Sequence, residues 1–140
     1  MLIRSVLAWF LLAVIGVANG VLRGTTYGRL VSERTAHQIS TVTCVTGMFA
    51  GSHLLLRDVA GDVPKRTLLA IGAGWALATV VFEFGFGHFV ARESWSKLAR
   101  AYDLRTGQLW SAVPLAILVA PLLSGRLAAA QTERQKEAQR

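Results

Sequence analysis

Glu83 is the residue of this chain whose type and position carry the most chemical meaning. It lies inside a long apolar run, at residues 68–90. A carboxylate in hydrocarbon costs roughly 2.5 to 3.5 kcal/mol on insertion scales, so it is seldom kept without a purpose. We expect Glu83 to bind a proton or a cation. The structural alternative is a hydrogen-bonded link between helices, satisfied by Asn19 or Thr41.

Other polar residues fall at the same depth as Glu83. Asn19 lies late in the first apolar run and Thr41 lies early in the second, whereas Glu83 lies late in the third. A helix rises about 1.5 Å per residue, and successive spans alternate in direction, so these side chains occupy one half of the membrane. We therefore predict a polar pocket with Arg23 and His37 near its mouth. The predicted ligand- or proton-binding residues are Glu83, Asn19, Thr41, Ser40, His37, Arg23 and His88.

Three of the apolar runs also present a face of small and polar residues at helical spacing. Burying these faces together would assemble the pocket on the side of the first and third loops. The first face holds Gly16, Asn19, Gly20 and Arg23; the second holds His37, Ser40, Thr41, Cys44, Gly47 and Gly51; the third holds Gly72, Ala76, Thr79, Glu83 and Gly87.

Metal or haem chemistry is an alternative for the same residues, because His37 and His88 with Glu83 could supply ligands. No close motif such as HExxH or CxxC accompanies them. Moreover, five residues of helix turn His88 about 140 degrees away from Glu83. A histidine at a helix end more commonly meets headgroups and water. We therefore expect no catalytic residues, no metal and no cofactor, with a haem- or metal-binding enzyme as the weaker alternative.

Composition places these residues in a membrane protein. Of 140 residues, 53% are hydrophobic and only 16% are charged, which is outside the balance of a soluble domain. Apart from Glu83, the charged residues avoid four long apolar segments. The predicted fold is all-α and polytopic, a bundle of four transmembrane helices over about Ser5–Leu22, Ala36–Leu56, Leu68–Val90 and Leu109–Leu123.

The first segment would also suit a cleaved signal peptide, although its apolar run is longer than a usual signal core, so we favour a retained helix. Glycines recur there every fourth residue, at Gly16, Gly20, Gly24 and Gly28, which predicts close packing of a neighbouring helix. The second segment begins with a capping-box pattern, Thr35 with Gln38.

Between the third and fourth spans, Trp95, Leu98, Ala99 and Tyr102 share one helical face. This pattern predicts a short amphipathic helix on the membrane surface, ended by Asp103 and Gly107. The chain then divides into a transmembrane domain, 1–125, and a polar C-terminal tail, 126–140, which reads as a frayed or solvated helix end.

The net charge of +7 does not indicate a nucleic-acid partner, because the cations flank the apolar runs and suit lipid headgroups. Their distribution nearly cancels as a topology signal, with eight Lys and Arg on one side and seven on the other. We predict that both termini are cytoplasmic. The expected partners are the bilayer and either further copies of the chain or a larger membrane complex.

The runs Glu83–His88, Tyr102–Leu104, Ala18–Gly20 and Ala36–Gln38 together resemble a group of small bacterial four-helix integral membrane proteins. The resemblance covers most of the chain except the tail, and it implies a bacterial inner-membrane location. It implies no activity.

Two functional hypotheses follow from the residues. The first is a membrane protein whose pocket binds or passes a proton, a small cation or a polar small molecule. The second is an accessory or assembly subunit that packs against a larger membrane complex through its glycine faces.

Overall fold

The computed structural model describes residues 2–140, and every regular element in that range is helical. The long helices are α1 (Leu2–Thr25), α2 (Glu33–Ala60), α3 (Lys65–Phe89) and α5 (Ala112–Ala138). All four are long and apolar enough to cross a membrane. The short elements lie in the first and third connections: η1 (Tyr27–Arg29), α4 (Trp95–Arg100) and η2 (Leu104–Thr106). The four long apolar helices fit the predicted multi-pass membrane protein.

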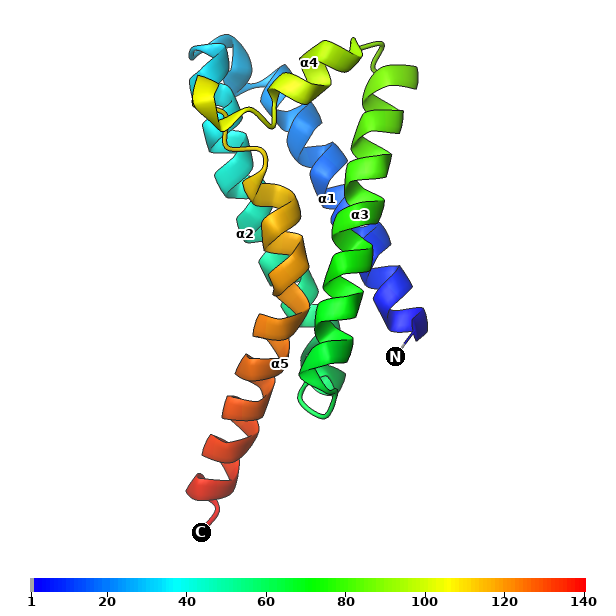
Figure 1. The fold of residues 1–140 in the computed structure, drawn as a ribbon. Helices are drawn as coiled ribbons and strands as arrows, with labels where there is room; N and C mark the ends of the chain where they lie inside the picture. Colours follow the sequence, from blue (N-terminus) through cyan, green and yellow to red (C-terminus); the bar gives the residue numbers. More distant parts are fainter. Residues whose placement is uncertain (1) are drawn as a thin grey trace.

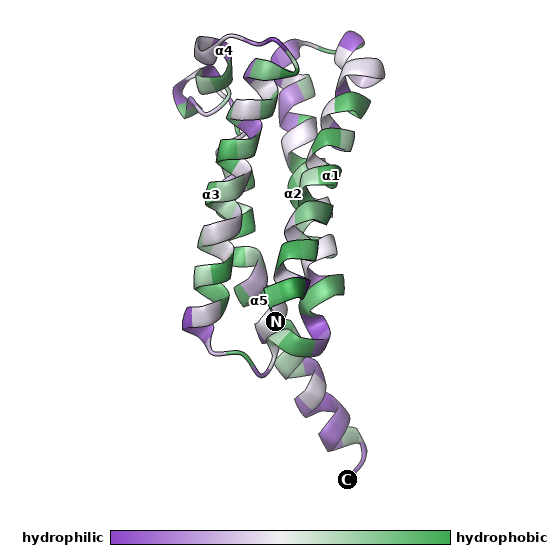
Figure 2. Cartoon of the chain, turned by 90° about the vertical axis from the view of Figure 1, so that its right-hand side faces the viewer, coloured by the Kyte–Doolittle hydropathy of each residue, from purple (hydrophilic) through white to green (hydrophobic). Residues whose placement is uncertain are grey.

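The last helix differs most from its predicted bounds. It begins three residues later than Leu109 and continues past Leu123 to Ala138. Pro114 lies in its first turn, where a missing N–H breaks no helical hydrogen bond. Beyond Gly125 the Ala, Gln, Glu and Lys residues have high helix propensity, which explains why the tail remains helical. This polar end of α5 extends away from the other helices (Figures 1 and 2).

The predicted capping box of α2 is wrong. The helix begins earlier, and its N-cap is Ser32, whose side chain accepts a hydrogen bond from the backbone N–H of Thr35 at 3.2 Å. Thr35 therefore lies inside the first turn. Gln38 instead uses its Nε2 to donate to the backbone oxygen of Gly107 at 3.2 Å. This bond ties the connection before α5 to α2.

The helices form an arc in the order α1, α2, α5 and α3. Helix α2 packs against both α1 and α5, and α5 packs against α3, whereas α1 and α3 have few contacts. Helices α3 and α5 approach closely at Gly72, where a side chain would collide with the backbone of Leu118. The second close approach brings Gly125 of α5 against the backbone of Ala60.

Helices α1 and α3 meet near the end of the bundle that holds the N-terminus. Trp75 donates from Nε1 to the backbone and side-chain oxygens of Ser5, both at 3.1 Å. Trp9 donates to Oγ1 of Thr79 at 3.2 Å. Further along, the two helices diverge toward the end that carries α4 (Figure 1). Helices α1 and α3 are therefore in contact near the N-terminal end of the bundle and apart near α4.

Of the α1 glycines in the predicted packing face, Gly16 meets another helix, with its Cβ position 3.6 Å from Met48 of α2, whereas Gly20 and Gly24 do not, which corrects the prediction in part. Nothing lies within 4 Å of the Cβ positions of Gly20 and Gly24. Gly28 lies outside the helix, in η1. Within the chain, the close contacts of α2 with α1 use different glycines, Gly47 and Gly51, against Ile15.

The short helix between α3 and α5 exists as α4, with Ser94 as its N-cap accepting from the backbone N–H of Lys97. The helix runs across the end of the bundle that holds the first and third connections, here called the loop end. In Figure 1 it lies above the space between α1 and α3. Its predicted position on the membrane surface stays a prediction.

Candidate functional site

Glu83 is bonded to two aromatic side chains that the sequence reasoning did not assign to it. The hydroxyl of Tyr102, just after α4, donates to Oε2 of Glu83, and Trp110, just before α5, donates from Nε1 to the same oxygen at 2.9 Å. Within residues 2–140, neither Asn19 nor Thr41 is hydrogen-bonded to this carboxyl. The other oxygen of Glu83, Oε1, accepts no hydrogen bond from residues 2–140, so it is free to bind a ligand.

The phenol of Tyr102 is kept protonated, which is the form that can donate a hydrogen bond to Glu83. Burial raises the pKa of its phenol, and the neighbouring Glu83 carboxyl raises it further. The phenol therefore stays protonated at neutral pH. Its ring also stacks on Phe84, with centroids 5.7 Å apart. These contacts fix the segment after α4 against α3.

A cavity of about 400 Å³ lies beneath this segment, and Glu83 is part of its wall. Its remaining surface is mostly apolar and comes from several elements. Gly16, Val17 and Gly20 supply the α1 side, Phe82 and Phe86 supply the α3 side, and Leu98 and Tyr102 lie toward α4. Gly20 thus leaves open space within the cavity, whereas the Cβ position of Gly16 lies 3.6 Å from Met48 of α2.

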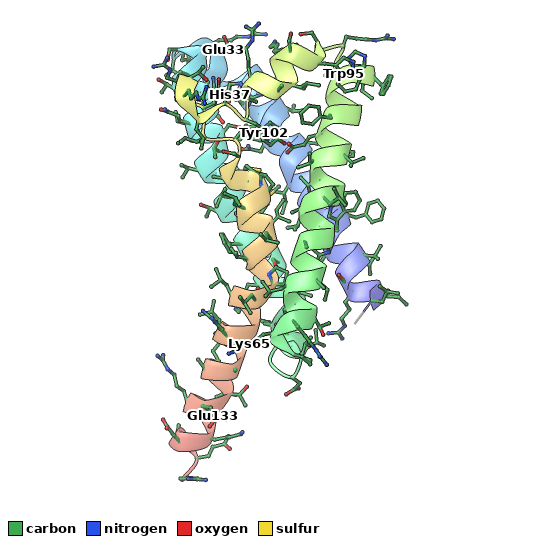
Figure 3. All side chains as sticks on the ribbon, viewed as in Figure 1. Glu33, His37, Lys65, Trp95, Tyr102 and Glu133 are labelled. Atoms are coloured by element: carbon green, nitrogen blue, oxygen red, sulfur yellow. The ribbon has the colours of Figure 1, made fainter. Side chains whose placement is uncertain are left out.

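Arg23 and His37 also line this cavity. Arg23 Nη1 is 3.2 Å from His37 Nδ1. A guanidinium only donates, so Nδ1 accepts and a neutral His37 carries its proton on Nε2. His37 lies near the start of α2 (Figure 3), and it lines the same cavity as Tyr102.

Asn19 and Ser40 belong to a separate cluster that joins α1 to α2, and Thr41 is bonded within α2. Asn19 Nδ2 donates to the backbone oxygen and to Oγ of Ser40, at 2.8 and 2.7 Å, and its Oδ1 accepts from Thr43 at 2.7 Å. Thr41 donates to the backbone oxygen of His37 at 2.8 Å. None of the three lines the cavity with Glu83. The predicted pocket of Glu83, Asn19 and Thr41 is therefore corrected: Asn19 bonds across the α1–α2 contact, and Thr41 bonds within α2.

His88 also lies apart from the cavity wall. Its ring stacks on Trp95 with centroids 3.9 Å apart, and its Nδ1 bonds to the backbone oxygen of Glu93 at 2.9 Å. The histidine thus anchors the beginning of α4. Trp95 marks this corner of the bundle in Figure 3.

Tyr102 and Trp110 are the site residues that the sequence reasoning missed. The sequence pattern predicts Tyr102 on the apolar face of a surface helix, which gives its hydroxyl no role. Both residues carry one donor on a large apolar ring, a combination that suits a buried acceptor near a membrane boundary. That general signal was present, but no spacing along the chain connects either residue to Glu83.

Among residues 2–140, no group of three or more His, Cys, Asp and Glu side chains is arranged to hold a metal ion. The haem or metal alternative remains untested by this observation. Comparison with known protein families, with curated proteins and with solved structures finds no match to this chain. The function must therefore be argued from the cavity itself.

Proposed function

We propose that this chain binds a small amphipathic cation, an apolar molecule with one protonated amine, in the cavity beneath α4. The observation that carries the proposal is the Glu83 carboxyl in a mostly apolar wall, with Oε2 held by two donors and Oε1 left for a ligand. Pockets for small molecules generally combine such an apolar lining with a few fixed polar groups.

The cavity narrows the range of ligands that the sequence left open. A volume of about 400 Å³ exceeds what a proton or a bare metal ion needs, and it suits a small organic molecule. Phe82, Phe86, Tyr102 and Trp110 line the cavity with aromatic rings. A ring face attracts an organic cation by about 0.5 to 2 kcal/mol. The ammonium group would bind Oε1 of Glu83, and the apolar body would lie between α1 and α3.

A proton is the natural competitor of this ligand, because it neutralises the same carboxyl. Lowering the pH should therefore weaken binding of the amine. Tyr102 and Trp110 take no part in this exchange. Their bonds to Oε2 hold the carboxyl in place whether Oε1 carries a proton or contacts an ammonium.

Replacing Glu83 by Gln tests the proposal with little change of shape. The amide oxygen of Glu83→Gln can still accept from Tyr102 and Trp110, so the helices should remain packed. Binding of 4-butylbenzylamine to the full chain in detergent, measured by calorimetry, should weaken by about ten- to a hundredfold, the value of a charged hydrogen bond. Binding of the neutral analogue 4-butylbenzyl alcohol should change little.

The matched control is Asp58→Asn, which removes a carboxylate at the opposite end of the bundle, where Asp58 is exposed beside Arg57. This variant should bind the amine as the unaltered chain does. Equal affinity for the amine in the unaltered chain and Glu83→Gln would assign Glu83 to structure alone.

A second candidate function, an accessory subunit of a larger membrane complex, is favoured by the open space at Gly20 and Gly24. Both could accept a helix from another chain. Replacing each by Phe separates the candidates, because Gly20 lines the cavity and Gly24 does not. We expect Gly20→Phe to block the amine and Gly24→Phe to leave its binding intact. Loss of a co-purifying partner in both variants would favour the subunit.

A further inference from the structure

A second cavity, here called the vestibule, lies at the loop end of the bundle and is rich in arginine. It measures about 840 Å³ and adjoins the first cavity, with which it shares Arg23, His37, Glu93, Leu98 and Ala101. Its wall contains five cationic side chains and two carboxylates; the cations are Arg23, Arg29, Arg34, Lys97 and Arg100. They come from α1, η1, α2 and α4.

Most of this positive charge is not neutralised by the protein. Lys97 pairs with Glu93 at 2.8 Å. Within residues 2–140, no carboxylate forms an ion pair with any of the four arginines. Arg23 donates to His37, while Arg29, Arg34 and Arg100 have exposed side chains. Guanidinium groups that converge on a concave surface provide several forked donors for one phosphate.

The overall charge of the loop end does not explain why cations cluster around the vestibule. This end carries seven Lys and Arg against three carboxylates, and the opposite end carries eight against four, so the formal charge is the same. Both cavities described above, however, lie at the loop end. What distinguishes the vestibule is the gathering of the cations around a hollow.

The depth of the vestibule suits a lipid headgroup. Arg23 lies in the last turn of α1, directly after the exposed apolar residues Val21 and Leu22, and Leu30 follows Arg29 with 83% of its surface exposed. Apolar side chains that directly precede cations along the chain match the boundary between acyl chains and headgroups. Basic pockets at this level are typical binding places for anionic lipid headgroups.

Gln108 adds an independent observation about the ligand. It lines the vestibule, and its Oε1 is buried without a hydrogen-bond partner in residues 2–140. A buried acceptor left unsatisfied costs about 1 to 3 kcal/mol. A ligand with a hydroxyl or N–H group beside its phosphate would supply the missing donor.

We propose that the vestibule binds an anionic phospholipid, with its phosphate among the arginines and a headgroup hydroxyl donating to Gln108. The acyl chains would lie along the outer surface near Val21 and Leu22. The proposal does not depend on Glu83 or on amine binding.

The test titrates the full chain in neutral detergent with phosphatidylglycerol and counts bound lipid by native mass spectrometry. The vestibule variant carries Arg29→Gln, Arg34→Gln and Arg100→Gln. Its matched control carries Arg66→Gln, Arg126→Gln and Arg134→Gln, which remove the same charge from exposed positions at the other end. We expect affinity to fall at least about tenfold in the vestibule variant and less than about twofold in the control. Equal losses, or no loss in either, would overturn the proposal.

Two further arms identify the ligand. Phosphatidylmethanol has the charge of phosphatidylglycerol without its hydroxyls, so it should bind a few-fold more weakly, and Gln108→Leu should remove the difference. A difference that persists in Gln108→Leu would contradict the role of Gln108. Glycerol 1-phosphate at millimolar concentration should not displace the lipid. Displacement would instead assign the vestibule to a soluble phosphate ester.

Discussion

At the scale of single residues, Tyr102 both holds the Glu83 carboxyl and lines the cavity. Its hydroxyl joins the segment after α4 to α3, and its ring forms part of the cavity surface. This dual role requires a phenol that keeps its proton. The raised pKa of Tyr102, caused first by burial and then by the Glu83 carboxyl, meets that requirement.

A titration of tyrosine absorbance tests this. The chain has two tyrosines, so Tyr27→Phe leaves Tyr102 as the only phenol. An ordinary tyrosine is half ionised near pH 10, whereas phenolate absorbance in Tyr27→Phe should appear only above that pH. Adding Glu83→Gln should lower the pKa but leave it above 10, because burial is the larger cause. A midpoint near 10 in the folded Tyr27→Phe chain would contradict the buried position of Tyr102.

The same shift affects stability in a defined direction. The folded state keeps the Tyr102 proton to a higher pH than the unfolded state does. The contribution of Tyr102 to stability is therefore fully present below pH 10 and is lost as the pH rises above it.

Glu83 could be found from the sequence because a carboxylate inside an apolar run is rare, and its depth followed from counting helical rise. Its partners could not be found in the same way. Tyr102 and Trp110 lie 19 and 27 residues away, beyond a connection with several turns. Asn19 belongs to another cluster, because depth does not specify which neighbouring helix a side chain faces.

At the scale of helices, the contact between α3 and α5 depends on the absence of a side chain at Gly72. A Cβ at this position would collide with the backbone of Leu118, which cannot move as a flexible side chain could. On the same helix, Gly74 has nothing within 4 Å of its Cβ position. These two glycines form a matched pair.

We expect Gly72→Ala to destabilise the folded chain by about 1 to 3 kcal/mol, the usual cost of overpacking. Gly74→Ala should be neutral or slightly stabilising, because alanine favours a helix over glycine. Thermal unfolding in detergent, followed by circular dichroism, would measure both. Similar effects of the two substitutions would argue against the close approach of α3 and α5.

The number and approximate positions of the four long helices could be predicted because length and hydrophobicity suffice. The order of packing could not. Lipid is as apolar as a protein core, so a spanning helix carries little sequence contrast between its lipid face and its buried face. Gly20 and Gly24 of α1 illustrate this, since their spacing predicts a packing face and they adjoin open space instead.

At the scale of the whole molecule, the two termini lie at the same end of the bundle, as an even number of spans requires (Figure 1). The cytoplasmic location of that end, and the bacterial inner membrane, stay predictions. The cations at the two ends are nearly balanced in number, so the sequence offers no strong topology signal. The two ends of the bundle nevertheless differ in shape, because the vestibule lies at the loop end.

Two hydrogen bonds hold the connection over the cavity. Tyr102 donates to Glu83 of α3, and Gln38 of α2 donates to the backbone oxygen of Gly107. Lifting it would require both bonds to break, and Arg23 opposes a cation arriving from that direction. Helices α1 and α3 have few contacts, so we expect the ligand to exchange with the bilayer between them. Occupancy should then follow the amount of amine dissolved in the lipid, so at a fixed total dose, adding more protein-free vesicles would dilute the ligand and empty the site.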